Sequence, residues 1–544
     1  MKRQPKNQGR GDFEHFIMSM DVSEADIRTK TFYEWAKTAG KLWISDKITL
    51  VRHPTDEQQG RCVMALENIA KGEKLFEIPR ESVLNVSTTS LCVEKPALRE
   101  VFMHQVGHWE GLIIAIFYEL KVVGENSPWW PYFRVWPEAV RMNSLMYWSD
   151  SEVAHLRPSG VCDRIGQEGA REMYQRVLDH VRELELSDLE TITWEEFVLV
   201  ASVIMAYSFD MERADYEEED EDEDEEEEDE EEEEGEQQEN EGEEEHGEVG
   251  SDVERTKGPS VWKDGFLKSM VPMADMLNAD THKCNANLTY SPESLIMVAI
   301  EDIPSGSQVY NIYGEFPNSE ILRRYGYVEW SGSKYDAAEI PLKTITSAAQ
   351  TCLGLSQEFT EKVLYLIEHD SEIKDEVLEG ESMVMDSYDC YLDGQFAPEY
   401  ITTLQILSGI ALVPKVETLG NAVLLGYLKK LVKRAIQSVN TGEMTRNCAN
   451  TCVSALDMRL RDYPSHSFRE PSPSSEYMGE LRLRERLAEC VLRGEVKSLQ
   501  NCAHRLEKEY QLIDDQVLLD KIMTVKRKVT YQKNKSKVAK KAKR

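Results

Sequence analysis

An uninterrupted run of acidic side chains is the feature that most constrains how this chain can fold. Residues 217–234 are all Asp or Glu, and residues 215–254 hold 28 acidic residues without a Lys or Arg. The run has no apolar side chain to bury, and its self-repulsion opposes compaction. We therefore expect a disordered acidic loop over residues 214–257, inserted between segments that do fold.

The rest of the chain has the composition of a folded protein. Without those 28 negative charges the formal net charge changes from −37 to −9, and 41% of all residues are hydrophobic. A length of 544 residues, at about 150 residues per domain, predicts two to four domains. The chain is therefore not disordered throughout, and its strong net charge describes one segment.

Targeting and cysteine signals predict a soluble intracellular protein. The longest apolar run, residues 112–118, is far shorter than the roughly 20 residues that span a bilayer. The N-terminal residues carry positive charge but no apolar stretch, so we expect neither a signal peptide nor a membrane anchor.

The ten cysteines are scattered without a CxxC pair. This spacing favours free thiols over a disulfide framework or a metal site.

Local patterns predict short strands and a few helices in the first part of the chain. Residues 60–65 and 74–79 are expected to be the two strands of a hairpin. Strands are also expected at 294–300 and 307–313. Residues 126–137 (NSPWWPYFRVWP) are expected to form an ordered loop without regular helix, packed by its rings. Apolar periodicity predicts helices at 31–43, 110–123, 194–211 and 317–325.

Helical patterns dominate from about residue 347, and strand signals almost vanish. This shift predicts a domain boundary near residues 335–350. The last 19 residues, 526–544, carry ten basic residues and no acidic one, and they form a predicted basic tail. The helices expected in this second part are 359–369, 398–413, 421–439, 448–461, 480–493 and 496–525.

Two polar residues stand in an apolar run, at Asp275 and Asn278. A buried polar group left unpaired costs about 1–3 kcal/mol, so both are expected to have partners. Asn278 can bind a ligand amine or carboxylate, bind a neighbouring backbone, or only cap a turn. Tyrosines at 310, 313, 325 and 327 cluster in the same region; by itself, such a cluster is more typical of a core than of catalysis.

Three longer motifs occur in order over residues 60–329: GRCVMALENIAKGEKLFEIPR, PMADMLNADTHKCNANL and YNIYGEFPNSEILRRYGYVE. In this order they resemble the SET-domain protein lysine methyltransferases, and among these the subgroup with a helical, Rubisco-methyltransferase-type substrate-binding domain. The phrases MAYSF at 205–209 and WWPYFRVWP at 129–137 resemble the SET domain-containing protein 6 type and its fungal counterpart, the ribosomal lysine methyltransferase 4 type. The resemblance covers about residues 30–525.

The resemblance implies an α+β fold. A SET fold of short twisted β-sheets with a knot-like substructure and a helical insert would be followed by an all-α C-terminal domain. The implied parts are a flexible N-terminus (1–28), a SET catalytic domain (29–335) with a helical insert (about 90–265), a helical substrate-binding domain (345–525) and the basic tail (526–544).

The implied cofactor is S-adenosylmethionine, with no metal ion. Gly60, Arg61 and Cys62 match the Gly-x-Gly cofactor turn of the family, with Cys62 in place of the second glycine. If Cys62 required a positive φ, its Cβ would cost of order 1 kcal/mol.

Further cofactor contacts are implied for Asn278, Ala279, Tyr207 and Tyr313. Asn278-Ala279 stands where the family has Asn-His, so contacts from a histidine ring are replaced by contacts from elsewhere or from the backbone alone. Tyr207 stands where more distant relatives have an arginine.

Tyr313 is the implied catalytic residue, because it occupies the family position of the catalytic tyrosine. Methyl transfer needs a neutral amine, whereas free lysine has a pKa of about 10.4. An apolar channel and a nearby positive sulfonium both lower that pKa. Tyr325 would line the lysine channel, and Trp129 and Ser208 are implied substrate contacts. A packing role for Trp129 remains equally open.

Two functions are compatible with these motifs. The first is methylation of a lysine on a large-subunit ribosomal protein, or on a histone or another nuclear protein. The alternative is a catalytically weak SET-fold binding module that chaperones basic proteins through the acidic loop. In either case, the electrostatic field of the acidic loop would attract basic partners. The other interpretation of the loop is an insertion without functional consequence.

The basic tail, residues 526–544, favours nuclear import, which predicts a nuclear protein with the cytoplasm as a second location. Weak contact with ribosomal RNA and tethering to the acidic loop are the other two interpretations of the tail. We expect a monomer that does not associate with membranes.

Overall fold

The computed structural model describes residues 24–53, 60–137, 142–212, 266–378, 380, 382–464 and 480–523. The chain forms two compact units. Of these described residues, the first unit comprises those up to 147, those within 163–314, and 323–326, and the second comprises 148–162, 315–322 and those from 327 onward. The second unit therefore takes three segments from within the expected catalytic domain, 29–335, namely 148–162, 315–322 and 327–335. The predicted acidic loop and basic tail lie outside the described residues.

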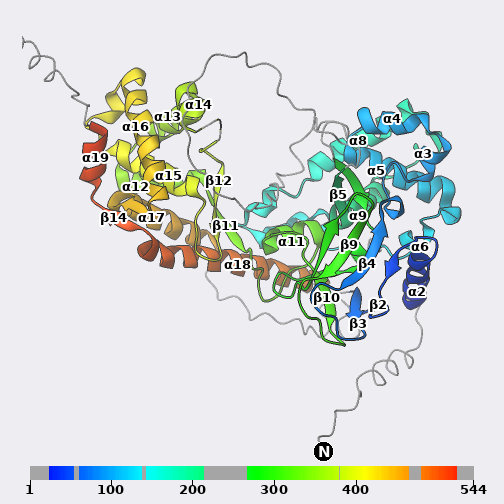
Figure 1. The fold of residues 1–544 in the computed structure, drawn as a ribbon. Helices are drawn as coiled ribbons and strands as arrows, with labels where there is room; N and C mark the ends of the chain where they lie inside the picture. The colour runs from blue at the N-terminus through cyan, green and yellow to red at the C-terminus, as the bar shows by residue number, and fades with distance from the viewer. Residues whose placement is uncertain are drawn as a thin grey trace, which may run out of the picture. The chain divides into compact units, whose positions relative to one another are not determined.

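The first unit contains two four-stranded sheets (Figure 1), with strand orders β1-β4-β9-β8 and β2-β3-β10-β7. Their strands pair antiparallel except for β10 and β7, which run parallel. A further antiparallel pair joins β5 and β6. The bounds are β1 Trp43–Ile44, β2 Ile48–Arg52, β3 Arg61–Ala65, β4 Lys74–Pro79, β5 Ser208–Glu212, β6 Phe266–Met270, β7 Asn278–Ala279, β8 Ala286–Tyr290, β9 Ser294–Ala299 and β10 Gln308–Asn311.

The hairpin predicted for residues 60–65 and 74–79 is wrong, although both strands exist. β3 pairs with β2 and β10, whereas β4 pairs with β1 and β9. Four of the five residues of β3 are buried, and a two-stranded hairpin cannot bury a strand to that extent. A glycine with positive φ, Gly72, lies between the two strands as expected, but each strand pairs with partners from elsewhere in the chain.

The helices of the first unit differ from the predicted ones in several places. The helix expected at 31–43 is observed as α2, Glu24–Lys37, which begins inside the expected flexible N-terminus, 1–28, and ends before β1. The helix expected at 110–123 is observed as α5 with its π-helical continuation, whereas α3, α4 and α8 were not predicted. The helix expected at 194–211 starts at a capping box, in which the Thr193 hydroxyl accepts from the Glu196 amide at 3.3 Å, and it ends at Tyr207 because the following residues pair as β5. The helices are α2 Glu24–Lys37, α3 Ser90–Glu94, α4 Ala97–His104, α5 His108–Phe117 with a π-helical continuation Tyr118–Val123, α6 Trp130–Phe133, α8 Gln167–Glu183 and α9 Trp194–Tyr207.

The aromatic segment at 126–137 contains a short helix, α6, which we did not expect. Pro131 lies in its first turn, where the missing N–H has no intrahelical partner in any case. Tyr132 is fully buried, and its ring centroid lies 5.9 Å from that of Phe32 and 5.6 Å from that of Trp136. The prediction that rings pack this segment is confirmed.

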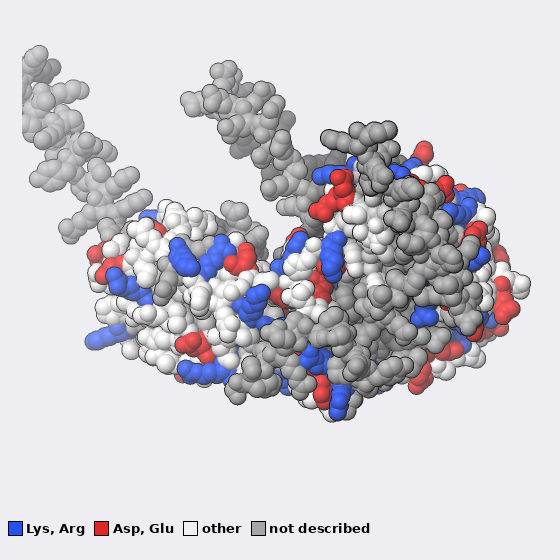
Figure 2. Space-filling view, turned by 90° about the horizontal axis from the view of Figure 1, so that it is seen from below, with Lys and Arg blue, Asp and Glu red and all other residues white. Residues whose placement is uncertain are grey.

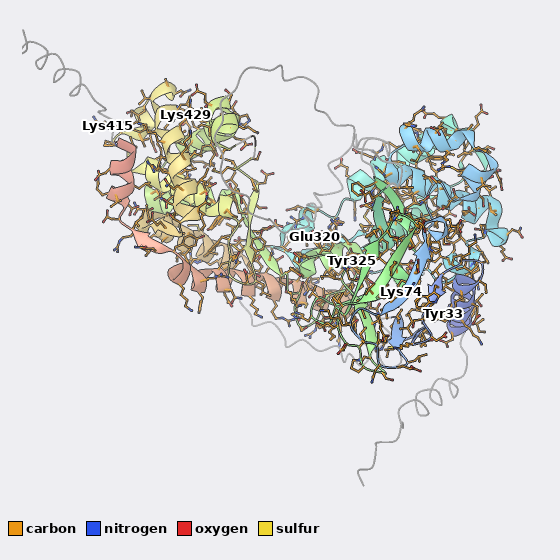
Figure 3. All side chains as sticks on the ribbon, viewed as in Figure 1. Tyr33, Lys74, Glu320, Tyr325, Lys415 and Lys429 are labelled. Atoms are coloured by element: carbon orange, nitrogen blue, oxygen red, sulfur yellow. The ribbon has the colours of Figure 1, made fainter. Side chains whose placement is uncertain are left out.

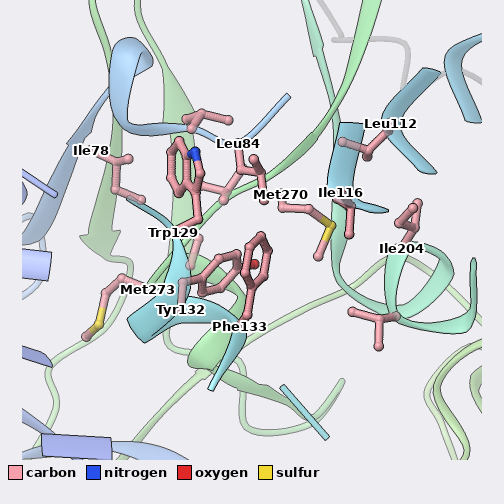
Figure 4. Close-up of a cluster of buried hydrophobic side chains, with 14 of the residues drawn as sticks. Ile78, Leu84, Leu112, Ile116, Trp129, Tyr132, Phe133, Ile204, Met270 and Met273 are labelled. Atoms are coloured by element: carbon pink, nitrogen blue, oxygen red, sulfur yellow. The ribbon is translucent and has the colours of Figure 1, made fainter. Parts of the chain in front are cut away.

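One apolar core holds the first unit together. It takes side chains from helices α2, α5, α6 and α9 and from both four-stranded sheets. Figure 4 shows part of it, with Trp129, Tyr132 and Phe133 of the aromatic segment drawn together with Met270 and Met273. The core therefore connects the aromatic segment to the chain that leads into β7.

The second unit is predominantly helical, as expected. It also contains two small sheets that the sequence did not indicate: β11 Ala337–Pro341 with β12 Ser387–Tyr391, antiparallel, and β13 Glu443–Thr445 with β14 Gln511–Ile513, parallel. Helix α11, Asn318–Tyr325, is divided between the two units. The other helices are α7 Asp150–Val153, α12 Leu342–Leu353, α13 Gln357–His369, α14 Ser371–Val377, α15 Pro398–Ala411, α16 Asn421–Asn440, α17 Arg446–Asp462, α18 Glu480–Glu509 and α19 Asp515–Met523.

The two helices predicted at 480–493 and 496–525 are wrong, because a single helix, α18, runs from Glu480 to Glu509. Gly494 lies inside it, and an added Cβ there would stand 2.5 Å from the Asp336 carboxylate. The glycine thus allows close packing and does not end the helix. After α18 the chain forms β14 and α19.

On the face shown in Figure 2, described basic and acidic side chains are interspersed among uncharged ones. No helix within the described ranges is long and apolar enough to cross a membrane.

Candidate active site

The parallel pair β7 and β10 brings two of the predicted site segments together. Asn278 stands opposite Tyr310 and Ala279 opposite Asn311. The Asn278 side-chain nitrogen Nδ2 donates to the carbonyl oxygen of Arg61 at 3.1 Å. Asn278 therefore joins β7 to the start of β3. Of the roles considered for it, the structure shows the bond to a neighbouring backbone.

The predicted cofactor turn precedes β3 and continues into it. Gly60 has φ 63°, and an added Cβ there would meet nothing within 4 Å. Cys62 is fully buried and pairs with Val51 in the extended backbone of β3. The second position of the turn therefore needs no positive φ, and Cys62 does not carry the strain considered above. Burial raises the pKa of the Cys62 thiol to about 12, so the thiol stays protonated.

The side chain of Arg61 holds other parts of the chain. Its guanidinium donates to Thr29 Oγ1 at 2.9 Å and to the carbonyl oxygen of Val135 at 2.7 Å. It thereby connects α2 and the aromatic segment to β3. Any contact of Arg61 with a cofactor at this turn is consequently assigned to its backbone.

Tyr313 and Tyr325 lie side by side in the first unit. Their ring centroids are 4.8 Å apart at an interplanar angle of 41°. The Tyr313 hydroxyl donates to the carbonyl oxygen of Leu277 at 2.7 Å, and Tyr325 ends helix α11 (Figure 3). The predicted catalytic and channel tyrosines are therefore neighbours, and Tyr313 is fixed beside the residue that precedes Asn278.

A glycine directly after Tyr325 allows this arrangement. Gly326 has φ +76°, and an added Cβ would stand 2.6 Å from the backbone nitrogen of Ser144. Only glycine adopts this conformation with backbone so close. The close contact between Gly326 and the backbone at Ser144 therefore fixes the position of the end of α11, where Tyr325 lies.

Tyr207 and Ser208 mark the junction of α9 and β5. Tyr207 is half-buried, and Ser208 pairs with Met270 as the first residue of β5. Burial and, secondarily, the negative charge of Asp275 raise the pKa of Tyr207 to about 12, while Arg61 acts in the opposite direction. Tyr207 therefore keeps its proton at neutral pH and can donate a hydrogen bond.

Trp129 is 6% exposed and packs edge-to-face against Trp35, with centroids 5.9 Å apart. Its indole nitrogen Nε1 is buried without a hydrogen-bond partner. This location favours the packing role over a substrate contact.

Sequence reasoning did not assign Asp275 and Tyr132 to the site. The Tyr132 hydroxyl donates to Asp275 Oδ2 at 2.5 Å, and Asp275 is 7% exposed. Its other oxygen, Oδ1, is buried without a partner. Burial raises the pKa of Asp275 to about 7, against the opposing effects of the Tyr132 hydrogen bond, the backbone N–H groups of Asp275 and Met273, and the Arg61 charge. The sequence did contain a sign of Asp275, namely a carboxylate within the apolar run that also contains Asn278. Its partner, Tyr132, could not be found in this way because it lies 143 positions away.

The backbone before Asp275 is strained. Met273 is fully buried and has φ +80° without being a glycine, a conformation that costs of order 1–3 kcal/mol and persists only where the surroundings enforce it. A 3-10 turn, Ala274–Met276, follows directly. The chain thus reaches Leu277 and Asn278 through a bend that needs support from its neighbours.

These residues fit the cofactor that the resemblance implies. The Gly60 turn leaves space for close approach of a ligand to the backbone, and Asn278 uses its amide nitrogen in the bond to Arg61, which leaves its amide oxygen as an acceptor for an ammonium group. None of the ten cysteines, all of which lie in described segments, forms a disulfide. Within the described segments, no three His, Cys, Asp or Glu side chains are grouped to hold a metal ion.

The chain resembles known proteins along most of its length. Residues 60–314 match the SET domain family. Ribosomal lysine N-methyltransferase 4 of Saccharomyces cerevisiae is 40% identical over 514 residues, which cover 93% of this chain and 97% of that protein. N-lysine methyltransferase SETD6 of Bos taurus is 30% identical over 325 residues, 59% of this chain and 61% of that protein.

Solved structures share the fold. A structure of Rubisco LSMT bound to sinefungin and monomethyllysine aligns with a TM-score of 0.56 at 14% identity, covering 95% of this chain and all of that one. A structure of Rubisco LSMT bound to AdoMet gives a TM-score of 0.55 at 15% identity, covering 91% of this chain and 93% of that one. The expected α+β SET fold is confirmed. Together with the near-complete match to the yeast enzyme, this places the chain in the family of SET-domain protein-lysine N-methyltransferases.

Proposed function

We propose that this chain uses S-adenosylmethionine to methylate a lysine on a large-subunit ribosomal protein. The observation that carries the proposal is the convergence of three distant segments: the Arg61 carbonyl, Asn278 and the Tyr313 hydroxyl are joined through two hydrogen bonds around Leu277 and Asn278. The name of the yeast relative, which matches nearly end to end, supports a ribosomal substrate.

The chain's own residues then have distinct tasks. S-adenosylmethionine, when bound, supplies a methyl group on a positively charged sulfur. Tyr313, whose hydroxyl donates to the Leu277 carbonyl, would orient the substrate amine through its oxygen. Tyr325 forms an aromatic wall beside it, and apolar surroundings lower the pKa of the lysine so that its amine loses a proton to water. Alignment and a fixed polar group carry most of the catalysis.

The substrate is identified by incubating the full chain with methyl-labelled cofactor and either intact large ribosomal subunits, free ribosomal proteins or histones. We expect label on one lysine of a large-subunit protein, located by mass spectrometry and abolished by excess S-adenosylhomocysteine. Label confined to histones would replace the ribosomal substrate. The absence of both label and cofactor binding by calorimetry would favour the chaperone alternative.

Two departures from the family motifs, Cys62 and Ala279, favoured the alternative of a catalytically weak binding module. The structure gives each of them a local explanation. Cys62 lies in ordinary strand backbone, and Ala279 contributes backbone pairing to β10. Neither substitution removes a group that the proposed contacts at Asn278 and Tyr313 require.

We infer nuclear localisation, with a cytoplasmic fraction, from the basic residues at 526–544. A fluorescent fusion that lacks these residues is expected to lose nuclear enrichment. Unchanged enrichment, with reduced retention on ribosomal RNA at low salt, would instead support the RNA-contact interpretation of the tail. We also propose that the protein acts as a monomer, which light scattering on the purified chain tests.

A further inference from the structure

We propose that Tyr132 and Asp275 are a positioning pair, which holds the backbone of residues 274–278 in the geometry that cofactor binding requires. The proposal deepens the proposed function and rests on it, because the group to be bound is S-adenosylmethionine. Neither residue is assigned a contact with the cofactor itself.

Tyr132 provides a rigid anchor. It is fully buried on α6, and its ring is surrounded by Phe32, Trp35 and Trp136 at centroid distances of 5.9, 6.5 and 5.6 Å. A hydroxyl on so constrained a ring has few alternative positions. The carboxylate that accepts its hydrogen bond is therefore fixed in turn.

Asp275 passes this constraint to the two hydrogen bonds of the site. It lies in the 3-10 turn that follows the strained backbone at Met273. Two residues further on, Leu277 accepts from the Tyr313 hydroxyl, and Asn278 donates to the Arg61 carbonyl. If Asp275 loses its anchor, the strain at Met273 can relax, and both bonds are displaced together.

The ionisation of Asp275 adjusts how firmly the turn is held. The titratable and charged groups that act on it are the Tyr132 hydroxyl from α6, the Tyr207 hydroxyl from α9 and the Arg61 guanidinium from β3, and the backbone N–H groups of Met273 and Asp275 act on it as well. An ionised carboxylate accepts a charge-assisted hydrogen bond, which is stronger than a neutral one. Because the pKa of Asp275 is about 7, its carboxyl group ionises as the pH rises from 6 to 8, and the hydrogen bond from Tyr132 becomes stronger. Cofactor affinity is expected to rise over the same interval.

The first test compares Tyr132→Phe with Tyr118→Phe by calorimetric titration of S-adenosylmethionine. Tyr118 is a suitable control, because its buried ring also carries a hydroxyl that donates to a carboxylate, that of the exposed Glu94, at 2.6 Å in the same unit but away from the turn. We expect Tyr132→Phe to raise the Kd for the cofactor about 10-fold or more, with Tyr118→Phe within about twofold of wild type. A purely structural role would lower the binding stoichiometry of Tyr132→Phe without changing its Kd, and that result would overturn the proposal.

The second test is the pH profile of Asp275→Asn. The asparagine keeps an acceptor for Tyr132 but does not titrate. Wild-type Kd for the cofactor is expected to fall between pH 6 and 8, and that of Asp275→Asn to stay constant. A variant that retains the wild-type pH dependence would contradict the assignment.

Hydrogen exchange separates this inference from the proposed function. In the cofactor-free chain, the amides of residues 274–279 are expected to exchange faster in Tyr132→Phe than in wild type or Tyr118→Phe. If wild type does not bind S-adenosylmethionine, the proposed function fails and the binding role of the pair fails with it, whatever the exchange rates. If wild type binds but Tyr132→Phe binds equally well, with unchanged exchange, only the positioning pair is overturned.

Discussion

The Tyr313 hydroxyl donates a 2.7 Å hydrogen bond to the carbonyl of Leu277, the residue that precedes Asn278. Because this bond uses the hydroxyl proton, the proposed contact with a substrate amine is one in which the Tyr313 oxygen accepts. The same segment presents Asn278 to the Arg61 carbonyl. Residues 277 and 278 therefore fix the position of Tyr313, proposed for catalysis, relative to Asn278, proposed for cofactor binding.

Tyr313→Phe is expected to lower kcat by about 100-fold or more, the usual effect of removing one fixed polar group from an active site. Its Kd for S-adenosylmethionine should change little, because the ring and its packing on Tyr325 remain. Single-turnover methylation and calorimetry measure the two quantities. Full turnover by the variant would remove Tyr313 from the mechanism.

Asn278→Ala is expected to weaken cofactor binding about 10-fold or more, because it removes both the bond to the Arg61 carbonyl and the free acceptor of the amide. Thr289→Val is a suitable control. It removes an exposed hydrogen bond from Thr289 on β8 to the Ile296 carbonyl on β9, and the variant should bind the cofactor like wild type. Equal Kd values for Asn278→Ala and wild type would refute the role of Asn278.

Gly326→Ala should destabilise the protein by more than about 2 kcal/mol, because the position combines a positive φ with a backbone nitrogen 2.6 Å from the added Cβ. Gly426→Ala, on α16 with nothing within 4 Å, should instead stabilise it by about 0.5–1 kcal/mol. Urea denaturation compares the two variants. Similar midpoints for both would show that the backbone at Gly326 can adjust.

Stability should decrease as the pH rises from about 4.5 to about 7, in part through Glu495 of the second unit. Its carboxylate accepts from Ser159 at 2.5 Å and Tyr463 at 2.7 Å, and burial raises its pKa from 4.5 to about 7. Because the folded-state pKa is raised, the contribution to stability is complete below pH 4.5 and is lost by the time the pH passes 7.

The free energy of unfolding of Glu495→Gln should lack this part of the pH dependence. Denaturant titrations of wild type and variant at several pH values between 4 and 8 provide the measurement. A difference between the two that stays constant over this range would contradict the assignment.

Deletion of residues 214–257 is expected to raise the KM for a basic protein substrate at low salt and to have little effect at high salt, because the acidic field attracts basic partners over about a Debye length. Steady-state methylation at 20 and 300 mM salt, on the order of the screening range, makes the comparison. An unchanged KM at low salt would support an insertion without functional consequence.

Local patterns predicted several of the longer helices and the four strands β3, β4, β9 and β10, because apolar periodicity acts over a few residues, but they missed the other described strands. The helix at 398–413 is observed as α15, Pro398–Ala411, and the strand at 294–300 as β9, Ser294–Ala299. The same reasoning failed at Gly494, which looked like a helix end until the packing against Asp336 explained it. It also failed for the hairpin, because strand pairing depends on distant partners.

The sequence by itself determined the family, through ordered motifs that place Asn278, Tyr313 and Tyr325 within one segment, and it determined that the acidic run could not form part of a core. Only the tertiary structure decided that Arg61 contributes its carbonyl to the site while its side chain holds Thr29 and Val135. It alone revealed Tyr132 as the partner of Asp275, 143 positions away in the sequence. A buried carboxylate must find a donor, but which donor it finds depends on how the core packs, and no local pattern encodes that choice.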